Sequence, residues 1–181
     1  MKFKKSAGIV WLGLKKMLAA FPVYWNVMEQ AIMTSISEYL CMDQQYILNL
    51  WSKVQKVVAM DSWNEARAIL AAMIRALHLH IEAEEKILFP VCEENMGWVA
   101  DPVFFMCFEH RQIGYLLKQL KIFADADEHA EFVDLADSLT NLLDLHNARE
   151  AMEIYPVFDR MPGIKRNRFL REIRGKVGLS A

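Results

Sequence analysis

The strongest constraint on the fold of this chain is an internal repeat at a shift of 66 residues. Under that shift, HIEAEEKILFP at residues 80–90 aligns with HNAREAMEIYP at residues 146–156. Upstream, DQQYI at residues 43–47 aligns with EHRQI at residues 109–113. A repeat at a fixed shift is the sequence signature of one structural unit used more than once. The alignment therefore predicts a fold built from two copies of one helix pair.

Helical patterns cover most of the chain. Seven Gly and five Pro among 181 residues disfavour turn-dense sandwiches and barrels. Capping-box spacing begins segments at Ser35 and Ser62, and apolar residues follow at helical spacing. We expect long helices up to residue 58, from 62 to about 89, over 103–123, and from the turn at 125–128 to about 155. Four long helices with short connections predict an all-α, up-down antiparallel four-helix bundle.

The charge is unevenly distributed along the chain. Residues 1–33 carry five Lys and one Glu, residues 34–156 carry nine basic and twenty acidic residues, and residues 157–181 carry seven basic and two acidic residues. We therefore divide the chain into an N-terminal basic and apolar extension at 1–33, a bundle at 34–160, and a tail at 161–181 that contains a basic helix. An acidic middle disfavours nucleic acid as the main partner.

The N-terminal extension begins like a secretory signal, with a basic start followed by an apolar run at residues 7–14. Lys15 and Lys16 interrupt this run, and no apolar stretch reaches the ~18 residues that a membrane span needs. Two interpretations remain open: an amphipathic helix that makes peripheral membrane contact through residues 1–21, or a poorly ordered extension.

The cysteines Cys41, Cys92 and Cys107 are odd in number and widely spaced, so they predict neither a disulfide framework nor a zinc finger. We expect a cytoplasmic protein with these thiols buried as small apolar groups.

Each copy of the repeat contains an H-x-x-x-E pair, His80 with Glu84 and His146 with Glu150. Residues four apart lie on one face of a helix, so each pair can bind a common metal site. A single pair is more often an ordinary exposed i,i+4 contact, but its recurrence in both copies favours a metal in the bundle core. His110 adds a third imidazole, and nitrogen and carboxylate ligands with open positions suit iron better than manganese or zinc.

Other titratable residues near these pairs are not predicted to be metal ligands. Glu82, Glu85 and Glu153 are expected to face solvent, and His129 is expected to be a surface or capping residue. The sequence has no Ser/His/Asp order, Gly-rich phosphate loop or HExxH motif that would support hydrolase or nucleotide chemistry.

At these residues the chain resembles the hemerythrin-like, or HHE cation-binding, family. The shared pattern is HxxxE followed by E-x-x-[LIV]-[FY]-P, then E/D-H-[RK]-x-I, then a second HxxxE, and it covers about residues 34–160. The resemblance implies an up-down four-helix bundle with a non-haem di-iron centre. It also implies that His80, His110 and His146 are terminal ligands. By the same resemblance, Glu84 and Glu150 are the bridging carboxylates.

One position departs from the family pattern. The first-helix His of the family falls where this chain has Gln44, and Gln44 precedes His80 by the same 36 residues that separate His110 from His146. An amide oxygen is a weaker iron ligand than an imidazole nitrogen. The site could then be a lopsided di-iron centre, a single-iron site or an empty one, or Gln44 could leave an open position or hold a water. We favour the weakened site.

Three functions remain open. The first is a di-iron protein that binds or senses oxygen, nitric oxide or iron. The second is an enzyme of the same architecture that reduces peroxide or delivers iron for cluster repair, with Tyr46 or Cys107 as candidate proton donor or redox group. The third is a metal-free interaction module whose basic ends bind an acidic surface. Whether the protein is an enzyme, and its oligomeric state, are left open.

Overall fold

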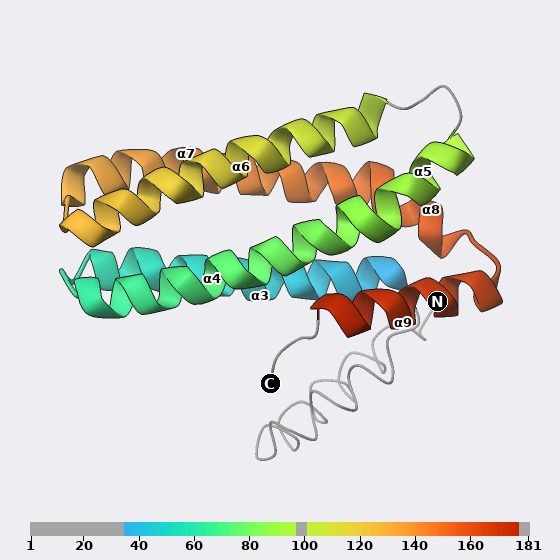
Figure 1. Ribbon diagram of the computed structural model, residues 1–181, viewed down its shortest axis with the longest axis horizontal. Helices are drawn as coiled ribbons and strands as arrows, with labels where there is room; N and C mark the ends of the chain where they lie inside the picture. The colour runs from blue at the N-terminus through green and yellow to red at the C-terminus, as the bar shows by residue number, and fades with distance from the viewer. Residues whose placement is uncertain (1–34, 97–100, 178–181) are drawn as a thin grey trace, which may run out of the picture. The chain divides into compact units, whose positions relative to one another are not determined.

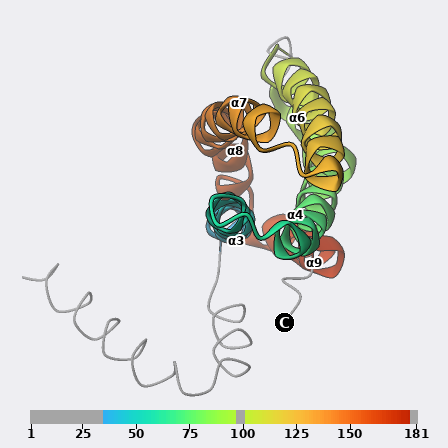
Figure 2. The ribbon, with the colours of Figure 1, turned by 90° about the vertical axis from the view of Figure 1, so that its left-hand side faces the viewer.

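The computed structural model describes residues 35–96 and 101–177, and every element within these ranges is a helix (Figure 1). Figure 2 looks along the bundle, where α3 lies beside α4 and α7, and α6 closes the square. The predicted all-α, up-down four-helix bundle is confirmed. Its long helices are α3 (Ile36–Val58), α4 (Trp63–Ala83), α6 (Asp101–Ala126) and α7 (His129–Arg149).

The predicted extension at residues 1–33, and with it the membrane contact through residues 1–21, lies outside the described residues. Among the helices that the structure describes, none is both long enough and apolar enough to cross a membrane.

Two π-helical turns extend α4 and α7 and were not predicted. They are η1 (Glu84–Leu88) and η2 (Glu150–Ile154), which lead into α5 (Phe89–Met96) and α8 (Tyr155–Asp159). The second helix therefore does not end at about residue 89 as expected, but continues through η1 and α5.

The π-turns stand at equivalent places in the two copies of the repeat, each with a proline close behind it, Pro90 or Pro156. Proline has no N–H, and its ring clashes with the carbonyl four residues earlier, so a regular α-turn is disfavoured there. In both turns the aromatic residue before the proline donates its backbone N–H to the carbonyl of the Glu five residues earlier. The aromatic-Pro dipeptide thus explains the position of both turns.

The helix ends are fixed by specific caps. Ser35 Oγ accepts from the backbone N–H of Glu38 at 3.0 Å, as its capping-box spacing predicts. The Asp159 carboxylate at the end of α8 accepts from Ile36 N at 3.1 Å, which ties α8 to the start of α3. The second predicted capping box is wrong, because the Ser62 side chain makes no capping hydrogen bond.

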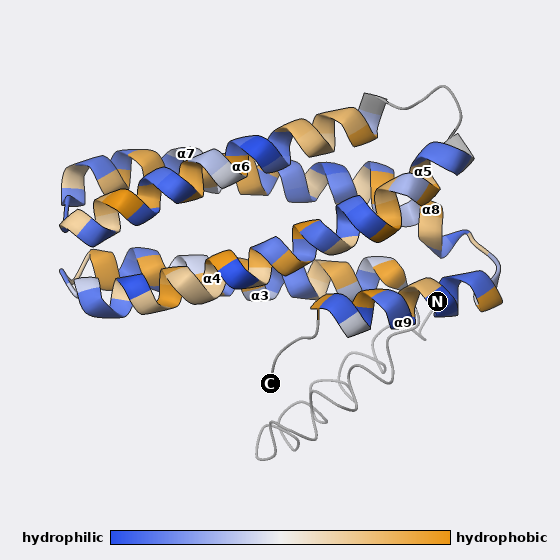
Figure 3. Ribbon diagram, viewed as in Figure 1, coloured by the Kyte–Doolittle hydropathy of each residue, from blue (hydrophilic) through white to orange (hydrophobic). Residues whose placement is uncertain are grey.

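An apolar core fills the bundle next to the α3–α4 and α6–α7 turns, and each of the long helices contributes one hydrophobic face to it (Figure 3). Its largest members include Trp51, Met73, Leu120 and Phe132. Burying a large apolar side chain stabilises a fold by roughly 1.5–3 kcal/mol. Trp51 also donates its indole N–H to Thr140 Oγ1 at 2.9 Å, which joins α3 to α7.

The predicted basic tail helix is observed as α9 (Gly163–Val177), which packs against α3, α4 and η1. Leu170, Ile173 and Val177 are its buried residues, and Lys176 Nζ lies 3.1 Å from Glu82 Oε1 on α4. The expectation of buried thiols holds for Cys92 but is wrong for Cys41, which is exposed because it lies outside the arc of α3 that faces the core.

Candidate metal centre

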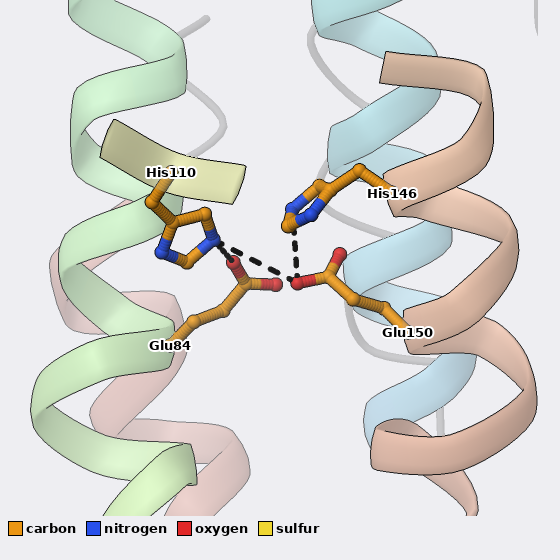
Figure 4. Close-up of side chains that lie close together, drawn as sticks. All are labelled: Glu84, His110, His146 and Glu150. Carbon is orange, nitrogen blue, oxygen red and sulfur yellow. Dashed lines mark ion pairs between the residues drawn. The ribbon is translucent and has the colours of Figure 1, made fainter. Parts of the chain in front are cut away.

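At the end of the bundle opposite the apolar core, the four long helices enclose a cluster of polar side chains. The polar and charged residues that the structure buries are found here, and they include the six that the sequence singled out (Figure 4 shows four of them). They are Asp43, Gln44, His80, Glu84, Glu109, His110, His146 and Glu150. Such groups are costly in a protein interior unless they are paired or bind a cation.

Three histidines point into the cluster, and each is oriented by a carboxylate on its outer nitrogen. A carboxylate that binds Nδ1 fixes the ring orientation and turns Nε2 toward the centre, which is the usual arrangement around metal-ligating histidines. The Nδ1-to-oxygen distances are 2.7 Å for His80 with Asp43, 2.8 Å for His110 with Glu85, and 3.0 Å for His146 with Glu109.

The inner atoms of the cluster have no hydrogen-bond partner. They are the Nε2 atoms of His80, His110 and His146, with Glu84 Oε2 and Glu150 Oε1. His146 Nε2 lies 3.2 Å from Glu150 Oε1, and His110 Nε2 lies 3.4 Å from Glu84 Oε2, so the atoms approach without hydrogen-bond geometry. Leaving a buried polar atom unsatisfied costs about 1–3 kcal/mol.

Four of the five residues that carry these atoms converge on one place, and His80 lies outside that group, with its Nε2 3.0 Å from Glu84 Oε1. Ligand atoms of Glu84, His110, His146 and Glu150 all lie within 4.8 Å of one another, and Figure 4 shows the two imidazoles facing the two carboxylates. Nitrogen and carboxylate donors that share a centre and lack other partners fit a metal ion. The donor set therefore can hold a metal cofactor.

Gln44 does not point an oxygen at the centre. Its amide donates to Glu150 Oε2 and to the Tyr155 hydroxyl, each at 2.7 Å. The same hydroxyl lies 2.7 Å from Glu84 Oε1 and 2.8 Å from Glu150 Oε2. Glu84 thus directs one oxygen toward His110 and the other toward Tyr155 and His80. Glu150 directs one oxygen toward His146 and the other toward Gln44 and Tyr155.

Burial and charge shift the pKa values of His80 and His146. Burial lowers the pKa of His80, but the charge of Glu84 and the hydrogen bond to Asp43 outweigh it and raise this pKa well above its ordinary value. For His146, burial acts in the same downward direction, and the neighbouring Glu150 carboxylate raises the pKa to about 9. Without a cation, protons on the imidazoles balance the buried carboxylates.

The two central carboxylates shift in opposite directions. Burial would raise the pKa of Glu84, but the facing imidazoles of His80 and His110 hold it well below its ordinary value. Burial and then the charge of Glu84 raise the pKa of Glu150. Two neighbouring carboxylates resist being ionised together because their negative charges repel, so the pKa of one of them is raised.

The family assignment follows from a comparison with family models. The model named Hemerythrin HHE cation binding domain matches residues 36–158. The chain belongs to this family. Neither the search of curated proteins nor the search of solved structures found a match. The match to the hemerythrin HHE domain confirms the predicted resemblance.

Some residues of this hemerythrin HHE centre were missed by the sequence analysis. Asp43 and Glu109 orient histidines, and they align with each other under the 66-residue shift. The repeat therefore held the signal for both. Glu85 is partly exposed, as predicted, yet its carboxylate binds His110 Nδ1.

The tyrosine at the centre is Tyr155, and not the Tyr46 proposed as a proton donor, which is 40 % exposed. Cys107 is partly buried, and burial followed by the charge of Glu85 raises the pKa of its thiol. Glu153 faces solvent, as expected, and His129 is an exposed residue at the start of α7 whose ring meets Trp63 edge-on.

Proposed function

We propose that the protein binds iron as a carboxylate-bridged pair at this centre and uses it to bind a small diatomic ligand, oxygen or nitric oxide. The observation that carries the proposal is the set of unpartnered inner atoms, three imidazole nitrogens and two carboxylate oxygens, in a buried site. Each of the three rings is already oriented by an outer carboxylate.

The chemistry of the donors favours iron over other metals. Zinc in structural sites prefers a closed tetrahedral set that is rich in Cys and His, and magnesium and calcium prefer oxygen ligands. Imidazoles mixed with carboxylates, with protein ligands too few to fill the coordination sphere, are typical of non-haem iron. In that arrangement Glu84 and Glu150 each have two oxygens facing the centre and can bridge two ions.

A buried aromatic side chain shields one side of the site from water. Phe89 is buried and stacks on the His110 ring at a centroid distance of 5.6 Å, which excludes water from that side. When bound, the iron pair supplies electrons and open coordination positions for a diatomic ligand. The proposed setting is the cytoplasm, since the three cysteines are free thiols.

Metal analysis tests the proposal. The purified protein is stripped with a chelator, reconstituted anaerobically with ferrous iron and desalted, and its iron content is then measured. We expect about two iron ions per chain, held by mixed nitrogen and oxygen ligands, and a change in absorption when nitric oxide is added. Glu84→Ala with Glu150→Ala should remove the iron, because both bridging groups are lost.

The exposed Glu153→Ala variant is the matched control, since it removes a carboxylate next to the site without touching it. Circular dichroism checks that each variant remains helical. A wild-type protein that retains no iron after reconstitution would leave the metal-free interaction module as the better description. A double variant that keeps all its iron would place the metal elsewhere.

A further inference from the structure

Two differences between the copies of the repeat meet at one place. Under the 66-residue shift Gln44 takes the position of His110, and Tyr155 takes the position of Phe89. Both residue pairs join one copy to the other. Phe89 of the first copy stacks on His110 of the second, with rings only 11° from parallel. At the matching contact, the Gln44 amide of the first copy donates to the Tyr155 hydroxyl of the second at 2.7 Å.

We propose that Tyr155 is a metal ligand and supplies the donor that Gln44 does not. The second iron is then bound by His80 Nε2 and the Tyr155 oxygen, with Glu84 and Glu150 bridging to the first. The donor then comes from the first residue of α8, directly after η2, instead of from the first helix. This inference rests on the proposed iron centre, and it assigns one of its two halves.

The donor atoms already have the spacing of a coordination sphere. The Tyr155 oxygen lies 2.7 Å from Glu84 Oε1 and 2.8 Å from Glu150 Oε2, and His80 Nε2 lies 3.0 Å from Glu84 Oε1. Metal–ligand bonds of about 2.0–2.1 Å at right angles separate neighbouring ligand atoms by about 2.9 Å. A phenol has one hydrogen and cannot donate to both carboxylates, so a cation satisfies this oxygen cluster better.

The π-turn brings Tyr155 to this position. In an ideal α-helix, a residue five positions after Glu150 lies about 140° away around the helix axis. In η2 the backbone N–H of Tyr155 donates to the carbonyl of Glu150, so one extra residue is accommodated in the turn. The side chains of both residues consequently face the same centre, where the Tyr155 ring is fully buried.

His80 is oriented as a ligand even though the first helix carries Gln44 where the repeat would place a second histidine. Asp43 binds its Nδ1 at 2.7 Å, just as Glu109 binds His146, and its Nε2 is buried without a partner. This is the positioning that metal-bound imidazoles need.

Gln44 is a positioning residue in this arrangement. Its amide donates to the Tyr155 oxygen and to Glu150 Oε2, so both bonds stabilise the negatively charged forms of the two ligands. When the iron binds, it displaces the phenol proton, which is released to solvent. Tyrosine is an established protein ligand of iron, as in haem catalases.

Ferric loading tests the assignment directly. A phenolate bound to ferric iron has a charge-transfer band in the visible region, and resonance Raman excitation within that band enhances tyrosinate ring vibrations. We expect both signals in the iron-loaded wild-type protein. Tyr155→Phe should remove them and lower affinity for the second iron by about tenfold or more. Tyr115→Phe, at an exposed tyrosine, should change neither.

A double variant sharpens the test. Gln44→His with Tyr155→Phe restores the residues of the other copy, and it should regain the second iron without the tyrosinate band. Iron-loaded wild-type protein without tyrosinate vibrations would overturn the inference while leaving the iron centre intact. A wild-type protein that binds no iron would instead overturn the proposed function. The wild-type spectrum decides the assignment even if Tyr155→Phe fails to fold.

Discussion

The α3–α4 and α6–α7 halves of the bundle have the same framework but different side chains at the centre. Both place a His–Glu pair before a π-turn, and both orient the His with a carboxylate from the neighbouring helix. They differ where one half has His110 and the other Gln44, and where one has Tyr155 and the other Phe89. Backbone geometry and outer hydrogen bonds are therefore the same in both halves while the inner side chains differ.

The outer carboxylates also differ between the halves. Asp43 binds His80 and is 3 % exposed, whereas Glu109 binds both His146 and the Arg149 guanidinium. A carboxylate that also binds Arg polarises the imidazole less, so His80 and His146 have outer partners of unequal strength. The following predictions test whether this asymmetry reaches the metals.

The largest effect is expected from removing one inner nitrogen in each half. His146→Ala should weaken binding of the iron between α6 and α7, and His80→Ala should weaken binding of the other iron. Each loss should exceed about 100-fold, because removing even an outer partner of a ligand costs 10–100-fold. Calorimetric titration with ferrous iron measures both sites.

His78→Ala is the matched control, since His78 is exposed on the same helix as His80. Equal loss of both irons in each single-histidine variant would mean that the two positions bind as one unit, and the comparison of halves would fail at the level of the metals.

The next effect concerns the metal-free protein and pH. The pKa of His146 is about 9 in the fold against an ordinary value of 6.5, and that of His80 is raised as well. Their stabilising contribution is complete below pH 6.5 and is lost as pH rises through about 9. We expect the free energy of unfolding of the chelator-treated protein to fall over this window by on the order of 1–3 kcal/mol.

Urea unfolding at a series of pH values measures this dependence. The iron-loaded protein should lose less stability over the same window, because metal-bound imidazoles are already deprotonated. It should also be more stable at neutral pH, by about 2.7 kcal/mol at a hundredfold excess of free iron over the dissociation constant. Identical curves with and without iron would contradict a metal in the core.

A smaller effect is expected at the outer carboxylates. Asp43→Asn and Glu109→Gln keep the side-chain size but weaken the bond to Nδ1, so each should lower metal affinity in its own half by about 10–100-fold. Asp43→Asn should have the larger effect on the metal, since Glu109 divides its charge between His146 and Arg149. The reverse order in a competition assay with a metal indicator would show that Arg149 strengthens its half.

The smallest effect is expected at Glu85. Its side chain is 43 % exposed, so solvent screens its bond to His110. Glu85→Gln should lower iron affinity by about tenfold at most, at the low end of outer-partner effects. A loss of iron affinity as large as that of Asp43→Asn would show that solvent exposure does not weaken the effect of an outer carboxylate on its histidine.

Much of this architecture could be predicted from the sequence. The repeat shows that two helix pairs share one plan, and the helical spacing of apolar residues shows where the helices lie. His80, Glu84, His146 and Glu150 are recognisable for that reason, since an i,i+4 pair needs only a regular helix. Tyr155 was missed because α-helical spacing places it on a different face from Glu150. Only the π-turn aligns them, and its cause, a proline after an aromatic residue, was visible but not interpreted.

Anomalous X-ray diffraction at the iron edge, from crystals of the reconstituted protein, would reveal a two-iron centre with unequal halves. We expect two anomalous peaks bridged by Glu84 and Glu150, one beside His110 and His146 and the other beside His80 and Tyr155. A single peak would contradict the pair, and no peak between the two carboxylates would contradict the centre itself.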